Sequence, residues 1–183
     1  MSGIISDNIG RAGGLVKASG GGGVVKQQVI TLKQDFILLT GDVFPDDSIP
    51  QNTEGAELMT RAITPNDSAN ILVIEGIVNC GFTGNSASAS HKILGLFQDT
   101  TANALAAVAV EDTTQSSANG QFQMIFRHRM AAGTTSATTF KVRLGASGSP
   151  NEVAVNDRER GGGNGDLGGS QFMTHIMITE YAL

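Results

Sequence analysis

Cysteine is nearly absent from this chain of 183 residues, and tryptophan is missing altogether. The single cysteine, Cys80, excludes an intramolecular disulfide, a zinc site built from cysteines and a Cys-X-X-Cys redox pair, and it fits synthesis in a reducing cytoplasm. Because Cys80 lies within an apolar run, we expect it to be a small buried hydrophobic residue rather than a nucleophile.

Charged side chains are also scarce, at 16% of the chain against about 25% in an ordinary soluble domain. The formal net charge is −5 and the 12 basic residues are scattered, so we expect no nucleic acid and no anionic membrane as a partner. The sequence contains no run of about 20 apolar residues, which a membrane-spanning helix needs. Residues 1–10 lack a basic start followed by an unbroken apolar stretch, so we expect no secretory signal.

Glycine, in contrast, is abundant, with 24 residues, and this favours a turn-rich all-β chain because glycine adopts the positive backbone angles of tight turns. Ten segments show the alternation or the short apolar runs of strands, separated by loops rich in Gly, Ser, Thr and Asn. The predicted strands are 24–32, 36–39, 57–63, 71–80, 92–98, 105–111, 121–130, 138–144, 152–156 and 171–181. Two segments, 101–110 and 54–63, compete weakly as helices.

The organisation that follows is one β-domain, residues 24–183, preceded by residues 1–23 as an extended Gly-rich N-terminal arm. The arm ends in a hinge of four glycines, residues 20–23. In segment 121–130 the side chains of Phe122, Met124, Phe126, His128 and Met130 share one face, which is typical of a half-buried antiparallel strand. Eight to ten such strands without helical crossovers predict an antiparallel jelly-roll-like sandwich.

No set of residues specifies a catalytic centre. Residues 163–168 have the spacing of a dinucleotide-binding glycine fingerprint, but that fingerprint follows a buried strand and opens a helix, and neither is expected here. The three histidines, His91, His128 and His175, show no metal-ligand spacing, and no nucleophile elbow or phosphate-binding loop is present. We therefore assign no catalytic, cofactor-binding or metal-ligating residue and expect a protein that is not an enzyme. A pair of carboxylates that converge in space is the alternative that sequence leaves open.

Two acidic clusters could supply oxygen ligands to a calcium ion. Asp157 and Asp166 form one, and Asp42, Asp46 and Asp47 form the other. The first cluster contains one imperfect copy of a glycine-aspartate nonapeptide, whereas the known calcium-binding β-helices repeat that unit. We interpret both clusters as solvated loop acids.

The two ends of the chain resemble a known family. Residues 1–17 (MSGIISDNIGRAGGLVK) resemble the N-terminal segment of small virion proteins of tailed bacteriophages. The strand that begins Ile71-Leu72-Val73, the Thr-Thr-Phe-Lys-Val-Arg strand at 138–143 and the closing segment 172–181 resemble the β-rich C-terminal part of those proteins.

This resemblance implies a jelly-roll domain that forms a homotrimer and is displayed on the virion, with the N-terminal arm bound to a capsid or tail protein. The chain would be made in the host cytoplasm, in line with the lack of a signal. The apolar pairs Ile4-Ile5 and Leu15-Val16 are the expected particle-attachment residues, through strand addition to a neighbour's sheet. Residues 71–80, which are apolar on both faces, are the candidates for trimer contacts.

Two functions are consistent with these features. The first is architectural: a decoration, cement or short-fibre component of the particle. The alternative is a receptor-binding knob of a tail fibre, which would recognise a host surface glycan or protein through the loops 112–120 and 158–170. The chain is short for a fibre with both shaft and knob, and this favours the first.

Overall fold

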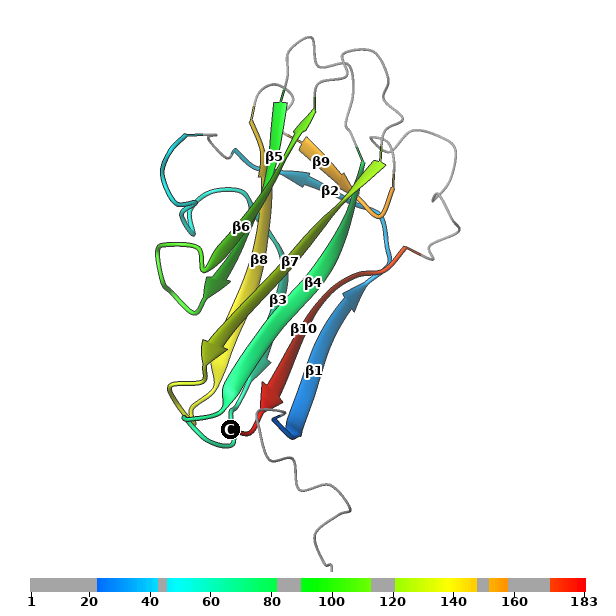
Figure 1. Cartoon of the computed structure of the whole chain (residues 1–183). Helices are drawn as coiled ribbons and strands as arrows, with labels where there is room; N and C mark the ends of the chain where they lie inside the picture. Colours follow the sequence, from blue (N-terminus) through cyan, green and yellow to red (C-terminus); the bar gives the residue numbers. More distant parts are fainter. Residues whose placement is uncertain (1–22, 43–45, 82–89, 113–120, 148–151, 158–171) are drawn as a thin grey trace, which may run out of the picture.

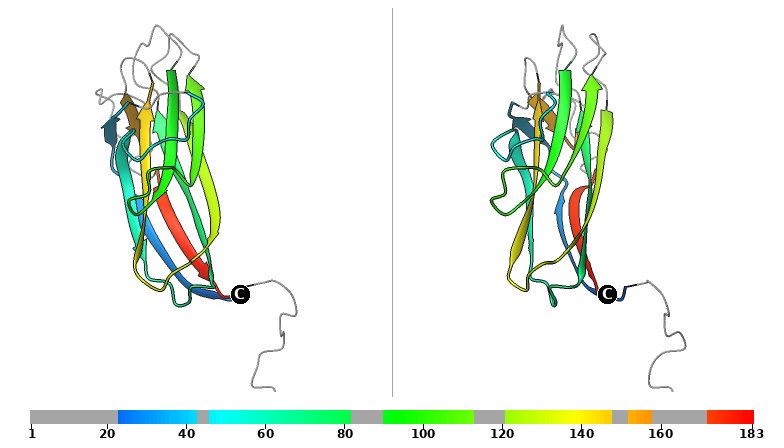
Figure 2. Two further views of the ribbon diagram at one scale, coloured as in Figure 1. Left: turned by 90° about the vertical axis from the view of Figure 1, so that its left-hand side faces the viewer. Right: turned by 60° about the vertical axis from the view of Figure 1, so that its left-hand side comes forward.

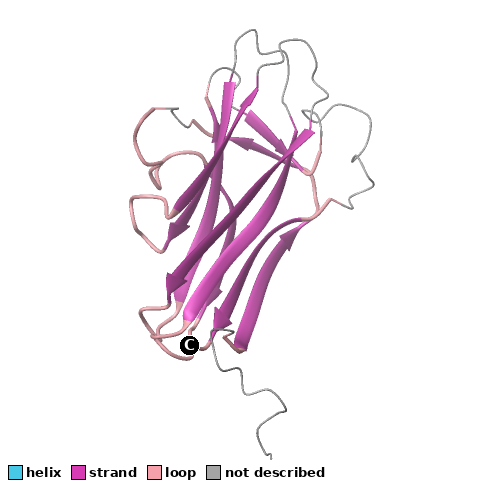
Figure 3. Cartoon of the chain, in the orientation of Figure 1, coloured by secondary structure: helices cyan, strands magenta, loops and turns pink. Residues whose placement is uncertain are grey.

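The computed structural model describes residues 23–42, 46–81, 90–112, 121–147, 152–157 and 172–183 (Figure 1). These residues form ten strands and no helix (Figure 3). The strands are β1 (Val25–Lys33), β2 (Ile37–Thr40), β3 (Ala56–Ile63), β4 (Ile71–Gly81), β5 (Ser90–Gln98), β6 (Ala106–Asp112), β7 (Gln121–Ala131), β8 (Thr138–Ala146), β9 (Glu152–Val155) and β10 (Thr174–Tyr181). Every strand predicted from the sequence is confirmed within a few residues. No helix that could cross a membrane occurs in the described part of the chain.

The strands pack as two antiparallel sheets facing each other (Figure 2). One sheet contains the order β1-β10-β4-β7, and the other has the order β3-β8-β5-β6. These two four-stranded orders are those of a jelly roll, so the predicted all-β sandwich is confirmed. The short strands β2 and β9 are additions that extend the first sheet beside the end of β4.

Both segments that competed as helices form strands instead. Residues 56–63 pair with β8 as β3, with a register shift between Glu57 and Met59. The alanine-rich segment pairs with β5 as β6, which places Val108 and Val110 on the core side and Ala107 and Ala109 in solvent. Strand pairing and burial of one alternating face therefore outweigh the modest helix propensity of the alanines.

The core lies between the sheets and consists of the inward-facing side chains of both. Met124 and Phe126 of β7 point into it, as the alternation predicted, and lie opposite Val78 and Gly76 of β4. Cys80 is buried, with 2% of its surface exposed, which confirms the sequence interpretation. Burial raises the pKa of the Cys80 thiol to about 12, although the nearby charge of Lys92 acts in the opposite direction. The thiol is therefore protonated at neutral pH.

Asn156 joins the added strands to the main sheet. β10 pairs with β4 only as far as Ile77, and β9 takes over from Cys80 onward. At the junction Asn156 has a φ of 62°, and its backbone N–H donates to the carbonyl of Asn79 at 2.9 Å. Its side chain accepts from the hydroxyl of Thr174 at 2.7 Å and donates to two carbonyls, those of Lys33 and Asp35. Through its backbone and its side chain together, Asn156 thus holds four segments together.

The chain enters and leaves the sandwich at the same pole, which we call the arm pole (Figures 1 and 2). There the backbone N–H of Ala182 donates to the carbonyl of Val24 at 2.9 Å. Gly23 lies so close that a Cβ atom on it would be 2.5 Å from the carbonyl oxygen of Ala182. The last glycine of the run 20–23 is therefore required by packing. The far pole carries the ends of β4, β6 and β8 and the starts of β5 and β7.

Candidate interaction surface

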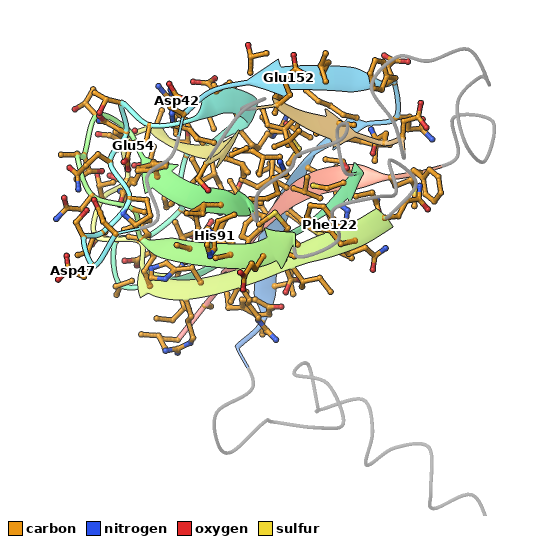
Figure 4. The ribbon with its side chains drawn as sticks, turned by 90° about the horizontal axis from the view of Figure 1, so that it is seen from above. Asp42, Asp47, Glu54, His91, Phe122 and Glu152 are labelled. Carbon is orange, nitrogen blue, oxygen red and sulfur yellow. The ribbon has the colours of Figure 1, made fainter. Side chains whose placement is uncertain are left out.

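The described residues contain no group of three or more His, Cys, Asp or Glu side chains that could hold a metal ion. Figure 4 shows the acidic side chains of Asp42, Asp47, Glu54 and Glu152 spread over the sandwich rather than gathered at one point. Asp46 accepts hydrogen bonds from the hydroxyl and the backbone N–H of Ser48, and these bonds lower the pKa of its carboxyl group. Its carboxylate therefore closes a local turn.

A hollow of about 210 Å³ lies on the outer face of the second sheet. Polar side chains that line this hollow make hydrogen bonds to other parts of the protein. Asp99 accepts from the backbone N–H of Thr139 at 2.8 Å, and Asn52 donates to the carbonyl of Thr101 at 2.9 Å. Arg143 donates to the carbonyls of Glu54 and Gly55. Asn52 and Arg143 thereby fix the β2–β3 connection on the sheet, and Asp99 fixes the turn between β5 and β6 to β8.

The outer face of the first sheet has a different character. Residues directly opposite each other on paired strands share a face, and the registers bring Leu32, His175, Ile77 and Ile125 into one row across β1, β10, β4 and β7. The neighbouring row contains Ile30, Met177, Glu75 and Arg127 in the same strand order. Ile125 is 61% exposed, Ile30 is 49% exposed and Leu32 is 45% exposed. We call these two rows the outer rows.

Strand β1 places its more apolar side chains outward. Ile30 and Leu32 lie in the outer rows, while the inward positions are taken by Gln27, Val29 and Thr31. Two of these inward side chains donate to the other sheet, the Gln27 amide to the carbonyl of Thr64 at 2.7 Å and the Thr31 hydroxyl to the carbonyl of Thr60 at 3.0 Å. The inward polar side chains of β1 are therefore engaged in hydrogen bonds between the sheets, and its apolar side chains Ile30 and Leu32 face outward.

β1 is also the first strand of its sheet, so one of its two backbone edges has no strand partner among the described residues. Natural edge strands are protected from further pairing by charges, proline, bulges or short length. β1 has lysines only at positions 26 and 33 and a register shift near its start, and its middle, residues 27–32, carries no charge and no proline.

The other edge strands differ from β1. β7 presents Arg127 and Arg129 outward, β2 has four residues, and β6 presents alanines. β3, on the second sheet, has two carbonyls near its edge occupied by the side chains of β1. Among the described edges, β1 alone combines length, an uncharged middle and exposed branched side chains.

The arm pole is fixed by Glu180, whose side chain is fully buried. Its Oε1 accepts from the side chain of Asn70 at 2.6 Å and from the backbone N–H of Asn66 at 2.8 Å. Its Oε2 accepts from the side chains of Gln27 at 2.6 Å and Asn66 at 3.0 Å. Burial alone would raise the pKa of Glu180, but the hydrogen bonds from Asn70, Gln27 and the loop backbone outweigh it and hold the pKa below its ordinary value. The carboxylate thereby ties β1, β10 and the β3–β4 loop together.

The residues selected from the sequence as attachment sites, Ile4, Ile5, Leu15 and Val16, lie outside the described residues. So do nearly all of the loops 112–120 and 158–170 and the glycine stretch 163–168. Of the strand candidates for trimer contacts, Ile77 lies in an outer row, whereas Leu72, Ile74, Val78 and Cys80 of the same strand face the core.

Sequence reasoning did not select Ile30, Leu32, Ile125 or Glu180. The first three could have been noticed as apolar residues in alternating strands, but the alternation does not say which face is covered. The role of Glu180 depends on donors more than 100 residues away in the chain. What the surface offers chemically is a strand edge with apolar side chains beside it, which suits the binding of an extended polypeptide.

Comparison with known proteins gives no matching family model and no matching curated protein. Solved structures of infectious bursal disease virus are similar to the chain. The structure of the Gt strain has a TM-score of 0.42 at 12% sequence identity, with 87% of this chain and 39% of that chain covered. The VP2 subviral particle has a TM-score of 0.35 at 15% identity, covering 87% and 38%, and the Gx strain has 0.36 at 14%, covering 87% and 38%. The chain thus spans well under half the length of the chains it resembles.

Proposed function

We propose that this chain is a non-enzymatic structural component of a tailed-phage virion. In this proposal it is a homotrimeric decoration, cement or short-fibre protein, and residues 1–23 anchor it to a capsid or tail protein. The observation that carries the proposal is the placement of the chain ends. Residue 23 enters at the arm pole beside Ala182, so a bound N-terminal segment would leave the far pole directed away from the particle.

The construction of the arm pole supports this role. A segment that tethers a domain transmits its load to the first residues of the fold, and here those residues are held from two sides. Val24 is bonded to Ala182, and Gln27 is bonded to the buried carboxylate of Glu180. Hydrogen bonds to a charged acceptor are stronger than those between neutral groups. The first residues of the domain are therefore held in place by hydrogen bonds on two sides, which suits them to bear the load of the attached segment.

The outer rows support the trimer. They contain three exposed apolar side chains, Ile30, Leu32 and Ile125, beside His175 and an ion pair between Glu75 and Arg127. Exposed apolar side chains on one face are typical of a surface that contacts another protein. A homo-oligomer with closed symmetry would cover them in every copy at once. Ile77, within the strand that the sequence proposed for trimer contacts, lies at the centre of the row.

The test uses particles that lack this protein. Full-length chain and a variant lacking residues 1–19 are each measured for mass by light scattering and then mixed with the particles. We expect the full-length chain to bind and the shortened variant, still folded by circular dichroism, to fail. Equal binding by the shortened variant would overturn the anchoring role of the arm. Intact particles whose adsorption to cells changes after substitutions in the loops 112–120 or 158–170 would favour the receptor-binding alternative instead.

A further inference from the structure

We propose that the free edge of β1 accepts the N-terminal segment of a second copy of this chain as an added strand, with one residue of the pair Leu15-Val16 packed against Ile30 and Leu32 and the other beside Val29. The inference rests on the proposed trimer, and it assigns the arm a role between copies as well as toward the particle. Strand addition supplies main-chain hydrogen bonds for affinity and alternate side-chain contacts for specificity.

The first support is the arrangement of side chains on β1. Its outward set is the more apolar one, and Ile30 and Leu32 remain about half exposed in the single chain. Their only lateral neighbours are on β10, where Met177 lies opposite Ile30 and His175 lies opposite Leu32. On the other side nothing among the described residues covers them. A strand added at this edge would extend both outer rows by one residue each.

The second support is the composition of the N-terminal segment. Leu15 and Val16 are consecutive, so in a strand they point to opposite faces. At the edge of β1, one of the two would pack on Ile30 and Leu32, and the other would pack on the inner side beside Val29, which already contacts the core. A consecutive apolar pair is what an edge strand of a sandwich needs when both of its faces are to be covered.

The third support is the strand register, because it differs between a segment that pairs with its own β1 and one that pairs with β1 of a second copy. If the segment folded back on its own β1 through a turn at residues 20–23, Ser19 would face Val24. Counting outward from there places Val16 opposite Gln27 and Leu15 opposite Gln28. Gly13 and Arg11 would then face Ile30 and Leu32, so neither apolar residue would meet them. In a second copy no turn fixes the register, and Leu15 and Val16 are free to reach the apolar positions.

Length and symmetry are compatible with this exchange. Val16 precedes Val24 by eight residues, which span about 26 Å when extended. The proposal therefore requires the β1 edge of the second copy to lie within that distance of Val24. Donation from each copy to the next is a head-to-tail contact, and such contacts close into a ring when the rotation between copies allows it. Ile4 and Ile5, ten residues further toward the N-terminus, remain available to the particle.

The first experiment is disulfide trapping between full-length chains. Two tagged chains, one with Leu15→Cys and one with Val16→Cys, are each co-expressed with an untagged chain that carries Ile30→Cys and are then oxidised. The natural Cys80 is buried and present in every chain. We expect a covalent dimer of tagged and untagged chains on a non-reducing gel. Ile49→Cys is the matched control for Ile30→Cys, because Ile49 is 52% exposed and lies in the β2–β3 connection; it should give no such dimer.

A second chain carries both Leu15→Cys and Gln28→Cys, the two positions that a turn at residues 20–23 would bring opposite each other, and it is oxidised alone at low concentration. A disulfide within one chain, together with no mixed dimer in the first experiment, would show that the segment pairs with its own β1 and would overturn the proposal. Absence of both products would also overturn it, and would leave the edge to a different protein.

Mass in solution gives an independent readout. Ile30→Lys should weaken association between copies by about tenfold or more, because a charge would have to be buried beside the added strand, while Ile49→Lys should leave the trimer unchanged. If Ile30→Lys remains a trimer, the inference fails. If it becomes monomeric yet still binds particles, and the mixed disulfide dimer forms in the first experiment, the inference holds and the anchoring function is separate. If the unaltered chain neither associates nor binds particles, it is the proposed function that fails.

Discussion

The carboxylate of Glu180, near the end of the last strand, lies 2.6 Å from the side-chain nitrogen of Asn70, in the loop that precedes β4. Gln27 of β1 donates to the same carboxylate, so the first strand, the last strand and a connecting loop depend on one buried negative charge. A buried charge is stable only when hydrogen bonds replace its lost water, and here five donors do so.

Replacing this charge should cost stability. In Glu180→Gln one oxygen becomes an amide NH₂ that faces donors and accepts nothing. We expect the free energy of unfolding to fall by about 2 kcal/mol, measured by urea denaturation. Asp46→Asn is the control, because Asp46 lies in solvent and its bonds are local to Ser48. A loss no larger than that of the control would show that Glu180 does not stabilise the arm pole.

The same residue predicts a pH dependence. The pKa of Glu180 lies below its ordinary value of 4.5 in the folded chain, so folding favours the ionised form. Its contribution to stability is therefore fully present above pH 4.5 and is lost as the pH falls through the lower, folded pKa. Unfolding free energies of the unaltered chain and Glu180→Gln should differ by a constant amount from pH 7 to pH 5 and converge below pH 4. Parallel curves down to pH 3 would contradict this.

Asn156 should tolerate glycine better than alanine. Both variants lose the side-chain bonds to Thr174 and to the carbonyls of Lys33 and Asp35. Only alanine is also strained by the φ of 62°. We expect Asn156→Ala to be less stable than Asn156→Gly by about 1 kcal/mol in chemical denaturation. Equal stabilities would mean that the backbone relaxes at this junction.

Cys80 should be inert while the chain is folded. Its thiol is buried and has a pKa of about 12, so almost no thiolate exists at neutral pH. Labelling with a thiol reagent at pH 7.5 should therefore be slow in buffer and become rapid in denaturant, where the thiol is exposed. Fast labelling of the folded chain would show that the sandwich opens locally around β4.

A substitution at Ile125 tests the proposed trimer, because Ile125 lies on β7, at the edge of the first sheet opposite β1. Because it is 61% exposed on β7, Ile125→Lys should leave the fold intact. If the outer rows are covered in the trimer, the substitution should reduce the mass measured by light scattering, whereas Ile49→Lys should not. An unchanged trimer would limit the contact surface to the β1 side.

Much of this fold is predictable from the sequence. Alternation and short apolar runs located all ten strands, the abundant glycine favoured an all-β chain, and the lack of helical crossovers favoured an antiparallel sandwich. The partners of each strand are not predictable in this way, because strand pairing is set by contacts between distant segments. β4 illustrates this: it pairs with β7 on one side and with β10 and then β9 on the other. The candidate surface depended on the same information. Ile30 and Leu32 look like core residues in the sequence, and only the polar contacts of Gln27 and Thr31 show why they face outward.

The adjacency of β1 and β10 has a mechanical consequence. If the N-terminal arm binds a particle as proposed, a pull on the domain away from that particle puts tension on residue 23. This tension runs along β1, whose residues pair with β10 from Val25 to Lys33. The hydrogen bonds between the two strands would then be loaded in shear and would have to break together, rather than one after another as in peeling. A domain held in this way resists detachment best when it is pulled along its long axis.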